Sequence, residues 1–138
     1  MMPRVTGILE SALYVADLDR SIRFYQDLFG FEQIAGDERF CALDVAGRQV
    51  LLLFREGCST TGSKTSGGFI PPHDGHGCLH FAFSIAADDW DAWLARLADA
   101  SIPVESRVDW PRGGRSVYFR DPDNHLVELV TPGCWTTY

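Results

Sequence analysis

The chain has 138 residues, enough for one domain with a buried core. Apolar residues make up 46% and charged residues 22% of it, which excludes a disordered, collagen-like or disulfide-framework chain. Nineteen acidic residues against twelve basic ones give a net charge of −7, which argues against nucleic acid or an anionic membrane as the main partner.

Nothing in the sequence predicts export or membrane insertion. The longest apolar run, Val50–Phe54, is far shorter than the ~20 residues that a membrane-spanning helix needs. The first residues, Met1–Gly7, lack the pattern of a signal peptide. The four cysteines form no C-x-x-C pair, which argues against a zinc ribbon or a thioredoxin-type motif. Because no signal peptide is recognised, we expect reduced thiols in a cytoplasmic protein, with Cys41 serving packing.

The first half of the chain predicts a strand, a helix and three more strands. Ile8–Val15 is rich in β-branched and aromatic residues, which favours a strand. Asp17 or Asp19 then caps a helix with apolar residues at helical spacing over Ser21–Phe29, and Gly30 ends it. Further strands are expected at Phe31–Ala35, Phe40–Val45 and Gln49–Arg55.

A long loop is expected next. Residues 57–77 contain six glycines, the pair Pro71-Pro72 and several Ser and Thr residues, and such a composition predicts a connection without regular structure. Loops of this length in compact domains are usually functional lids or linkers.

The pattern of elements then restarts. Leu79–Ile85 predicts a strand, and Asp88 or Asp89 caps a second helix that carries Trp90 on its apolar face. His125 follows in a turn, where we expect it to be solvated. Further strands are expected at Val104–Val108, Ser116–Arg120 and Leu126–Val130.

The two halves align with each other. Leu9–Ala16 matches Leu79–Ala86, with three identical pairs among the eight, and Val50–Leu53 matches Leu126–Leu129. Each half is therefore a β-α-β-β-β module. We predict a single α+β domain over residues 1–138, with modules at about 7–56 and 78–131 that form a mixed, curved sheet around a cleft.

Three polar residues stand out within this repeat. The alignment sets Glu10 opposite His80 and Leu52 opposite Glu128. Strand positions are usually buried on at least one face, and a buried charge needs a partner or a metal ion. Two carboxylates and one imidazole suit a divalent ion such as Zn, Mn, Fe, Ni or Co, with coordination positions left open for substrate. The alternative is that both glutamates face solvent and His80 is a packed core histidine.

Three segments, Leu13–Phe31, Leu79–Phe83 and Phe119–Leu129, resemble the vicinal oxygen chelate superfamily. That superfamily includes glyoxalase I, extradiol dioxygenases, epimerases, fosfomycin-resistance thiol transferases and bleomycin-binding proteins. The resemblance covers nearly the whole chain. It implies the glyoxalase-like fold, and it implies a homodimer whose clefts are completed or flanked by the partner.

The resemblance also implies metal ligands on the first and last strand of each module. Those positions are Glu10, Leu52, His80 and Glu128 here. Glu10 stands where a histidine is commoner, and Leu52 replaces a ligating acid, which argues against a standard glyoxalase I. A single histidine likewise weakens a dioxygenase assignment. Three of the four positions, Glu10, His80 and Glu128, therefore keep a residue that can bind a metal ion.

Other residues are candidates for proton transfer and substrate binding. His73, on the loop, and Glu128 are candidate general acids or bases, although a solvated loop histidine is the alternative for His73. Arg112 and Arg115 are candidates for binding a carboxylate or phosphate of the substrate, and the alternative is that they lie on a surface loop without a binding role. Tyr118 is a third candidate contact.

The sequence thus predicts a metal-dependent enzyme that binds a small substrate through two adjacent oxygens. Lyase, isomerase and dioxygenase-type chemistry all share a metal-stabilised oxyanion, as the resemblance implies. The alternative is a metal-free drug-binding protein of the bleomycin-resistance type. Metal content separates the two hypotheses.

Overall fold

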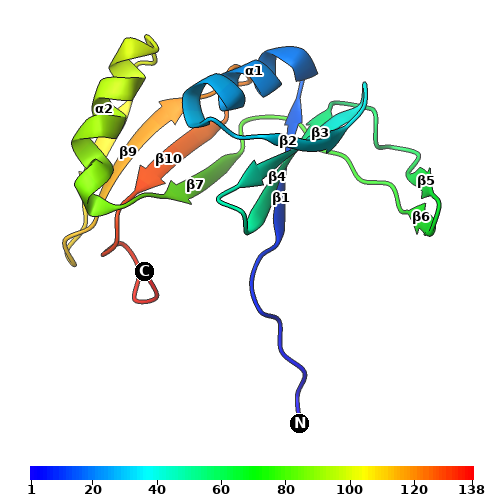
Figure 1. Cartoon of the computed structure of the whole chain (residues 1–138), viewed down its shortest axis with the longest axis horizontal. Coiled ribbons are helices and arrows are strands. Elements are labelled where there is room, and N and C mark those ends of the chain that lie inside the picture. Colours follow the sequence, from blue (N-terminus) through cyan, green and yellow to red (C-terminus); the bar gives the residue numbers. More distant parts are fainter. The chain divides into compact units, whose positions relative to one another are not determined.

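A computed structural model describes residues 1–138, which form two compact units, Met1–His76 and Gly77–Tyr138 (Figure 1). Each unit contains a four-stranded mixed sheet and one α-helix. None of the helices has the length and apolar character that crossing a membrane requires.

The first unit orders its sheet β1-β4-β3-β2, with β1 parallel to β4 and the other pairs antiparallel. Helix α1 (Leu18–Phe29) packs on β4 and β3. The Asp17 side chain caps it by accepting from the backbone N–H of Arg20, and Gly30 ends it in the left-handed conformation at φ 72°. The strands are β1 (Glu10–Val15), β2 (Gln33–Gly36), β3 (Phe40–Val45) and β4 (Gln49–Arg55).

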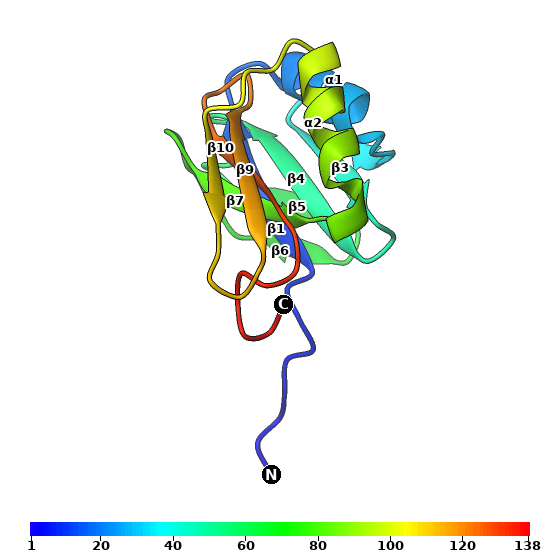
Figure 2. The ribbon, with the colours of Figure 1, turned by 90° about the vertical axis from the view of Figure 1, so that its left-hand side faces the viewer.

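The second unit repeats this topology in the order β7-β10-β9-β8. Helix α2 (Trp90–Asp99), preceded by the short 3₁₀ helix η1 (Ala87–Asp89), lies to one side of this sheet (Figure 2). The strands are β7 (His80–Ser84), β8 (Ser106–Asp109), β9 (Arg115–Arg120) and β10 (Leu126–Val130). The predicted repeat of two βαβββ modules is therefore confirmed.

Strand pairing confirms the alignment of the two halves residue by residue. In the first unit Ala12 of β1 pairs with Leu52 of β4. In the second unit Ala82 of β7 pairs with Glu128 of β10. Leu52 and Glu128 therefore occupy the same position in two copies of one architecture.

The expectation of an unstructured loop over 57–77 is wrong at its centre. A hairpin of β5 (Ser63–Thr65) and β6 (Gly68–Ile70) forms there and extends from the first unit's sheet (Figure 1). The Thr65 hydroxyl supports its turn, because it accepts from the Gly67 N–H at 3.2 Å and donates to the Gly68 carbonyl at 2.9 Å. Strands of three residues are too short to show the alternation that predicts a strand.

Candidate metal and substrate site

The second unit places His80 beside Glu128. His80 begins the edge strand β7, and Glu128 lies on the neighbouring β10. The nearest atoms, His80 Nε2 and Glu128 Oε1, are 3.5 Å apart. The glutamate side chain is almost fully buried, whereas half of the histidine side chain is exposed. The pair thus combines a desolvated carboxylate with an imidazole that solvent reaches.

A backbone contact determines which ring nitrogen of His80 carries the proton. His80 Nδ1 lies 2.9 Å from the carbonyl oxygen of Leu126, which can only accept, so Nδ1 donates. In the neutral ring Nε2 then holds a lone pair next to the glutamate oxygen. At 3.5 Å the two atoms are too far apart for a good hydrogen bond. Two donor atoms bound to one divalent ion at about 2.1 Å are roughly 3.0–3.4 Å apart, so the observed 3.5 Å is just above the separation that a shared metal ion requires.

The other carboxylate oxygen of Glu128 is held by a chain of hydrogen bonds. Ser116 Oγ donates to Glu128 Oε2 at 2.7 Å, and Trp110 Nε1 donates to Ser116 Oγ at 2.8 Å. Ser116 is fully buried on β9. These donors fix the orientation of the carboxylate and leave Oε1 for the histidine side, as outer partners of metal ligands usually do.

The structure separates the three predicted substrate contacts. The ring of Tyr118 lies 6.2 Å from that of His80, centroid to centroid, and burial together with the charge of Glu128 raises the pKa of its hydroxyl. Arg115, in contrast, stacks its guanidinium on the ring of Trp90 at 4.3 Å, and Arg112 lies exposed in the preceding turn. Tyr118 is therefore the one of the three that neighbours the His–Glu pair.

His125 corrects an expectation, because it is fully buried rather than solvated. Its Nδ1 accepts from the Leu79 N–H at 2.9 Å, just before β7. The Asp121 carboxylate accepts from the His125 N–H at 2.8 Å and so tightens the turn that carries the ring inward. His125 thereby supports the start of the strand that carries His80.

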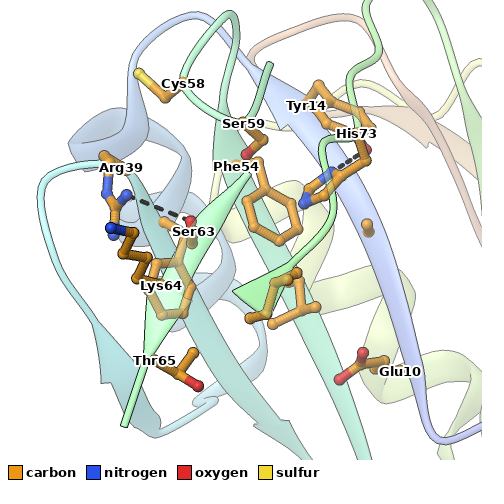
Figure 3. A pocket seen from close by; sticks show the side chains of 14 residues that line it. Glu10, Tyr14, Arg39, Phe54, Cys58, Ser59, Ser63, Lys64, Thr65 and His73 are labelled. Atoms are coloured by element: carbon orange, nitrogen blue, oxygen red, sulfur yellow. Dashed lines mark hydrogen bonds between the residues drawn. The ribbon is translucent and has the colours of Figure 1, made fainter. Parts of the chain in front are cut away.

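The first unit contains a cavity of about 630 Å³ between its sheet and the β5–β6 hairpin (Figure 3). Alternate residues of β1 line it, beginning with Glu10 at one end. Leu52 and Phe54 of β4 add an apolar surface. Leu52 thus lines the cavity at the position where Glu128 stands in the other unit.

His73 lies in this cavity as well, on the segment that follows the hairpin (Figure 3). Its Nδ1 is 2.7 Å from the hydroxyl oxygen of Tyr14, and its ring meets Phe54 edge-on at 4.5 Å between centroids. Burial, and to a lesser extent the charge of Asp74, raises the pKa of Tyr14. Gly75 packs against the Tyr14 ring so closely that a Cβ there would clash. The segment therefore holds His73 as an ordered group.

The sequence did not predict two cationic residues that line the cavity. Arg39 is the residue before β3, and Lys64 lies in the hairpin. Their only sequence signal was a basic residue within a short polar segment, a common surface pattern. The hairpin that brings Lys64 to the cavity was itself unpredicted.

Neither unit by itself brings together three or more His, Cys, Asp or Glu side chains that could hold a metal ion. Glu10 belongs to the first unit, and the His80–Glu128 pair belongs to the second. Each unit therefore carries part of the predicted ligand set.

Comparison with known proteins identifies the family. The model of the Glyoxalase/Bleomycin resistance protein/Dioxygenase superfamily matches residues 7–129. Metallothiol transferase FosB of Bacillus licheniformis is 31% identical over 129 residues, which cover 93% of this chain and 77% of that protein. Fosfomycin resistance protein FosX of Listeria innocua is 28% identical, over 91% of this chain and 89% of that protein.

Solved structures agree with the sequence relatives. The crystal structure of lactoylglutathione lyase from Agrobacterium tumefaciens superposes with a TM-score of 0.87 at 35% identity. The match covers 97% of this chain and 99% of that one. The glyoxalase-like α+β fold expected from the sequence is thereby confirmed.

Proposed function

Because the chain belongs to the glyoxalase/bleomycin resistance protein/dioxygenase superfamily, we propose that it is an enzyme whose His80, Glu128 and Glu10 bind one divalent metal ion. One observation carries the proposal: His80 Nε2 and Glu128 Oε1 lie 3.5 Å apart, and His80 Nδ1 donates to the Leu126 carbonyl, so that a neutral ring turns its lone pair toward the glutamate. A cation between these atoms removes the repulsion of lone pair and carboxylate. Zn, Mn, Fe, Ni and Co all suit such ligands.

Glu10 is proposed as the third ligand because it begins the edge strand β1, as His80 begins the edge strand β7. It is supplied either by the same chain or by a second copy. We propose a homodimer, since proteins of this fold are commonly dimeric. Sedimentation at micromolar concentration should then give twice the chain mass of 15.4 kDa.

A divalent ion held by these residues would supply a Lewis acid for two adjacent oxygens of a small substrate. Around it, Ser116 and Trp110 keep the Glu128 carboxylate in one orientation. The Tyr118 hydroxyl lies against Glu128, and burial together with that carboxylate raises its pKa, so it stays protonated and can donate to a substrate oxygen bound beside the pair.

Proton transfer is assigned to His73 and Glu128. Tyr14 holds Nδ1 of His73 at 2.7 Å, which leaves Nε2 to exchange a proton with the substrate. Arg112 and Arg115 remain proposed anion contacts, with Arg115 having to leave the Trp90 ring. The relatives include a thiol transferase and a lyase, and lyase, isomerase and dioxygenase-type reactions remain within the proposal.

Elemental analysis of native protein, purified without a metal-affinity tag, tests the proposal. We expect about one ion per chain in the wild type and in Glu38→Ala, which removes an exposed acid elsewhere. Glu128→Ala should lose the ion. If the wild type holds no stoichiometric metal even after reconstitution with each candidate ion, the proposal is wrong.

That negative result would favour a metal-free binding protein of the bleomycin-resistance type. The observation that supports this second candidate is the aromatic lining of the first unit's cavity by Tyr14, Phe40 and Phe54. Such a lining suits a flat ligand without any metal.

A further inference from the structure

The cavity of the first unit is charged at one end, in a protein that is otherwise acidic. Lys64 is the only lysine in the sequence, and it lines the cavity together with Arg39. Both side chains lie at the same end in Figure 3, and Glu10, the one acidic lining residue, lies at the other. With a net charge of −7 for the chain, this concentration of cations is a distinct local feature.

Hydrogen bonds to Asp37 and Ser63 hold Arg39 in place. Its Nη2 donates to the Asp37 carboxylate at 2.9 Å, and its backbone N–H donates to the same carboxylate at 2.7 Å. Asp37 does not line the cavity. Nη1 reaches across to the Ser63 hydroxyl of the hairpin at 3.4 Å. The guanidinium is thus anchored at one edge and keeps further N–H groups for a ligand.

Lys64 contributes a second, uncompensated charge. Its side chain is exposed on β5 and makes no ion pair or hydrogen bond. Asp37 forms an ion pair with Arg39, and the charge of Glu38 also acts on that guanidinium, so Lys64 is the cation at this end of the cavity that has no ion pair of its own. The hydroxyl of Ser63 lines the same end and adds a neutral donor, whereas the Thr65 hydroxyl already donates to the Gly68 carbonyl. A planar guanidinium beside an ammonium and a serine hydroxyl is a set of groups that binds a carboxylate or a phosphate.

Apolar side chains supply much of the remaining lining of the cavity. They are aliphatic and aromatic, from Leu52, Phe54, Phe40 and Ile70. A volume of about 630 Å³ lies within the range of sites for small organic molecules. The charged end therefore selects an anion, and the remaining surface favours an anion with an apolar body.

We propose that this cavity binds an amphiphilic organic anion, with its carboxylate or phosphate on Arg39 and Lys64 and its apolar body against Phe54 and Leu52. In this orientation the far end of the molecule points toward Glu10 and His73. Identifying the anion as the substrate rests on the proposed function, whereas the binding itself needs no metal. Arg39 and Lys64 are then specificity-determining residues.

Calorimetric titration of three matched probes tests the inference. They are 3-phenylpropionate, phenyl phosphate and the neutral 3-phenylpropanol, each titrated in about 50 mM salt with chelator present. We expect both anions to bind at least about tenfold more tightly than the alcohol, since charge-assisted hydrogen bonds are the stronger ones. The relative affinity of the two anions distinguishes a carboxylate from a phosphate ligand.

Variants assign the effect to the two cations. Lys64→Met, an exposed change that keeps the length of the side chain, should weaken anion binding about tenfold and leave the alcohol unchanged. Arg39→Gln should do the same or more. Arg48→Gln, in the exposed turn between β3 and β4, is the control and should bind like the wild type. Equal affinity for anions and alcohol, or unchanged anion binding in Lys64→Met, overturns the inference.

The metal-site variant separates this inference from the proposed function. Glu128→Ala, with chelator present, should bind both anions as the wild type does. If the wild-type protein holds metal but does not bind the anions, the anion site is refuted and the proposed function stands. Anion binding in a protein that never holds metal refutes the proposed enzyme and leaves the anion site standing.

Discussion

The two units use one architecture for different chemistry. In the first, Phe40 and Leu52 lie on the sheet face that lines an apolar cavity. In the second, Ser116 and Glu128 occupy the equivalent positions and form a buried hydrogen bond of 2.7 Å. The strand pairing is the same in both, so the backbone determines where a side chain lies and the residue type alone determines what it does there.

The comparison also explains why the second unit tolerates a buried carboxylate. An isolated charge there would cost several kcal/mol. Ser116 donates to one oxygen of Glu128, and the other faces His80. The first unit has no such donors at Leu52, and its one nearby acid, Glu10, stays exposed.

The largest effect is expected when the second unit is made like the first. Glu128→Leu should lower metal affinity by more than the roughly 100-fold that loss of an outer partner costs, because a ligand itself is removed. The free energy of unfolding of the metal-free protein should change by less than about 1 kcal/mol, since relief of a buried charge offsets the lost hydrogen bond. Metal titration and urea unfolding measure both. Glu38→Ala, which removes an exposed acid elsewhere, is the control and should bind metal as the wild type does, and metal binding retained in Glu128→Leu would refute the site.

The two cores should respond alike to the same deletion. Leu53 on β4 and Leu129 on β10 are equivalent and fully buried. Leu53→Ala and Leu129→Ala should each cost about 2–5 kcal/mol of unfolding free energy, measured by denaturant titration. Leu9→Ala, at an exposed position, should cost far less. A large cost in one unit and none in the other would show that the cores are unequal.

A smaller effect is expected from the donor behind the carboxylate. Ser116→Ala should weaken metal affinity by about 10- to 100-fold, because Glu128 loses the hydrogen bond that orients it. Ser116→Thr keeps the hydroxyl and should restore affinity. Competition with a chelating indicator gives the dissociation constants. Ser106→Ala, on β8 of the same sheet, is the control and should bind metal as the wild type does. If Ser116→Ala weakens metal affinity and Ser116→Thr does not restore it, Ser116 has no positioning role.

At neutral pH, the smallest change in stability is expected for a substitution of Cys41. The equivalent position of the second unit holds Val117, which is equally buried. Cys41→Val should change the free energy of unfolding by less than about 1 kcal/mol. Burial raises the pKa of the thiol from 9.0 to about 11, so the folded protein keeps a proton that the unfolded chain loses between these values. This contribution to stability is full below pH 9 and is lost as the pH rises toward 11.

The wild type should therefore lose roughly 2 kcal/mol more than Cys41→Val between pH 9 and pH 11. Urea titrations across this range measure the difference. Cys78→Ser, which changes an exposed thiol, is the control and should follow the wild type. Parallel curves for the wild type and Cys41→Val would contradict the assigned pKa.

The sequence by itself determined the repeat, the fold and the positions of Glu10, His80 and Glu128 on their strands. Its strand bounds for β3, β4 and β10 match the structure, because these strands have long apolar patterns and clear turns. The capping by Asp17 and the end of α1 at Gly30 are equally local signals.

Only the tertiary structure decided which side chains meet. The proton on His80 Nδ1 depends on a carbonyl of the neighbouring strand, and the burial of His125 depends on a turn that folds against β7. Arg115 stacks on Trp90, which lies 25 positions earlier in the sequence. Arg39 and Lys64 line one cavity and are likewise 25 positions apart. No local pattern encodes such contacts, because they arise from the packing of whole elements against one another.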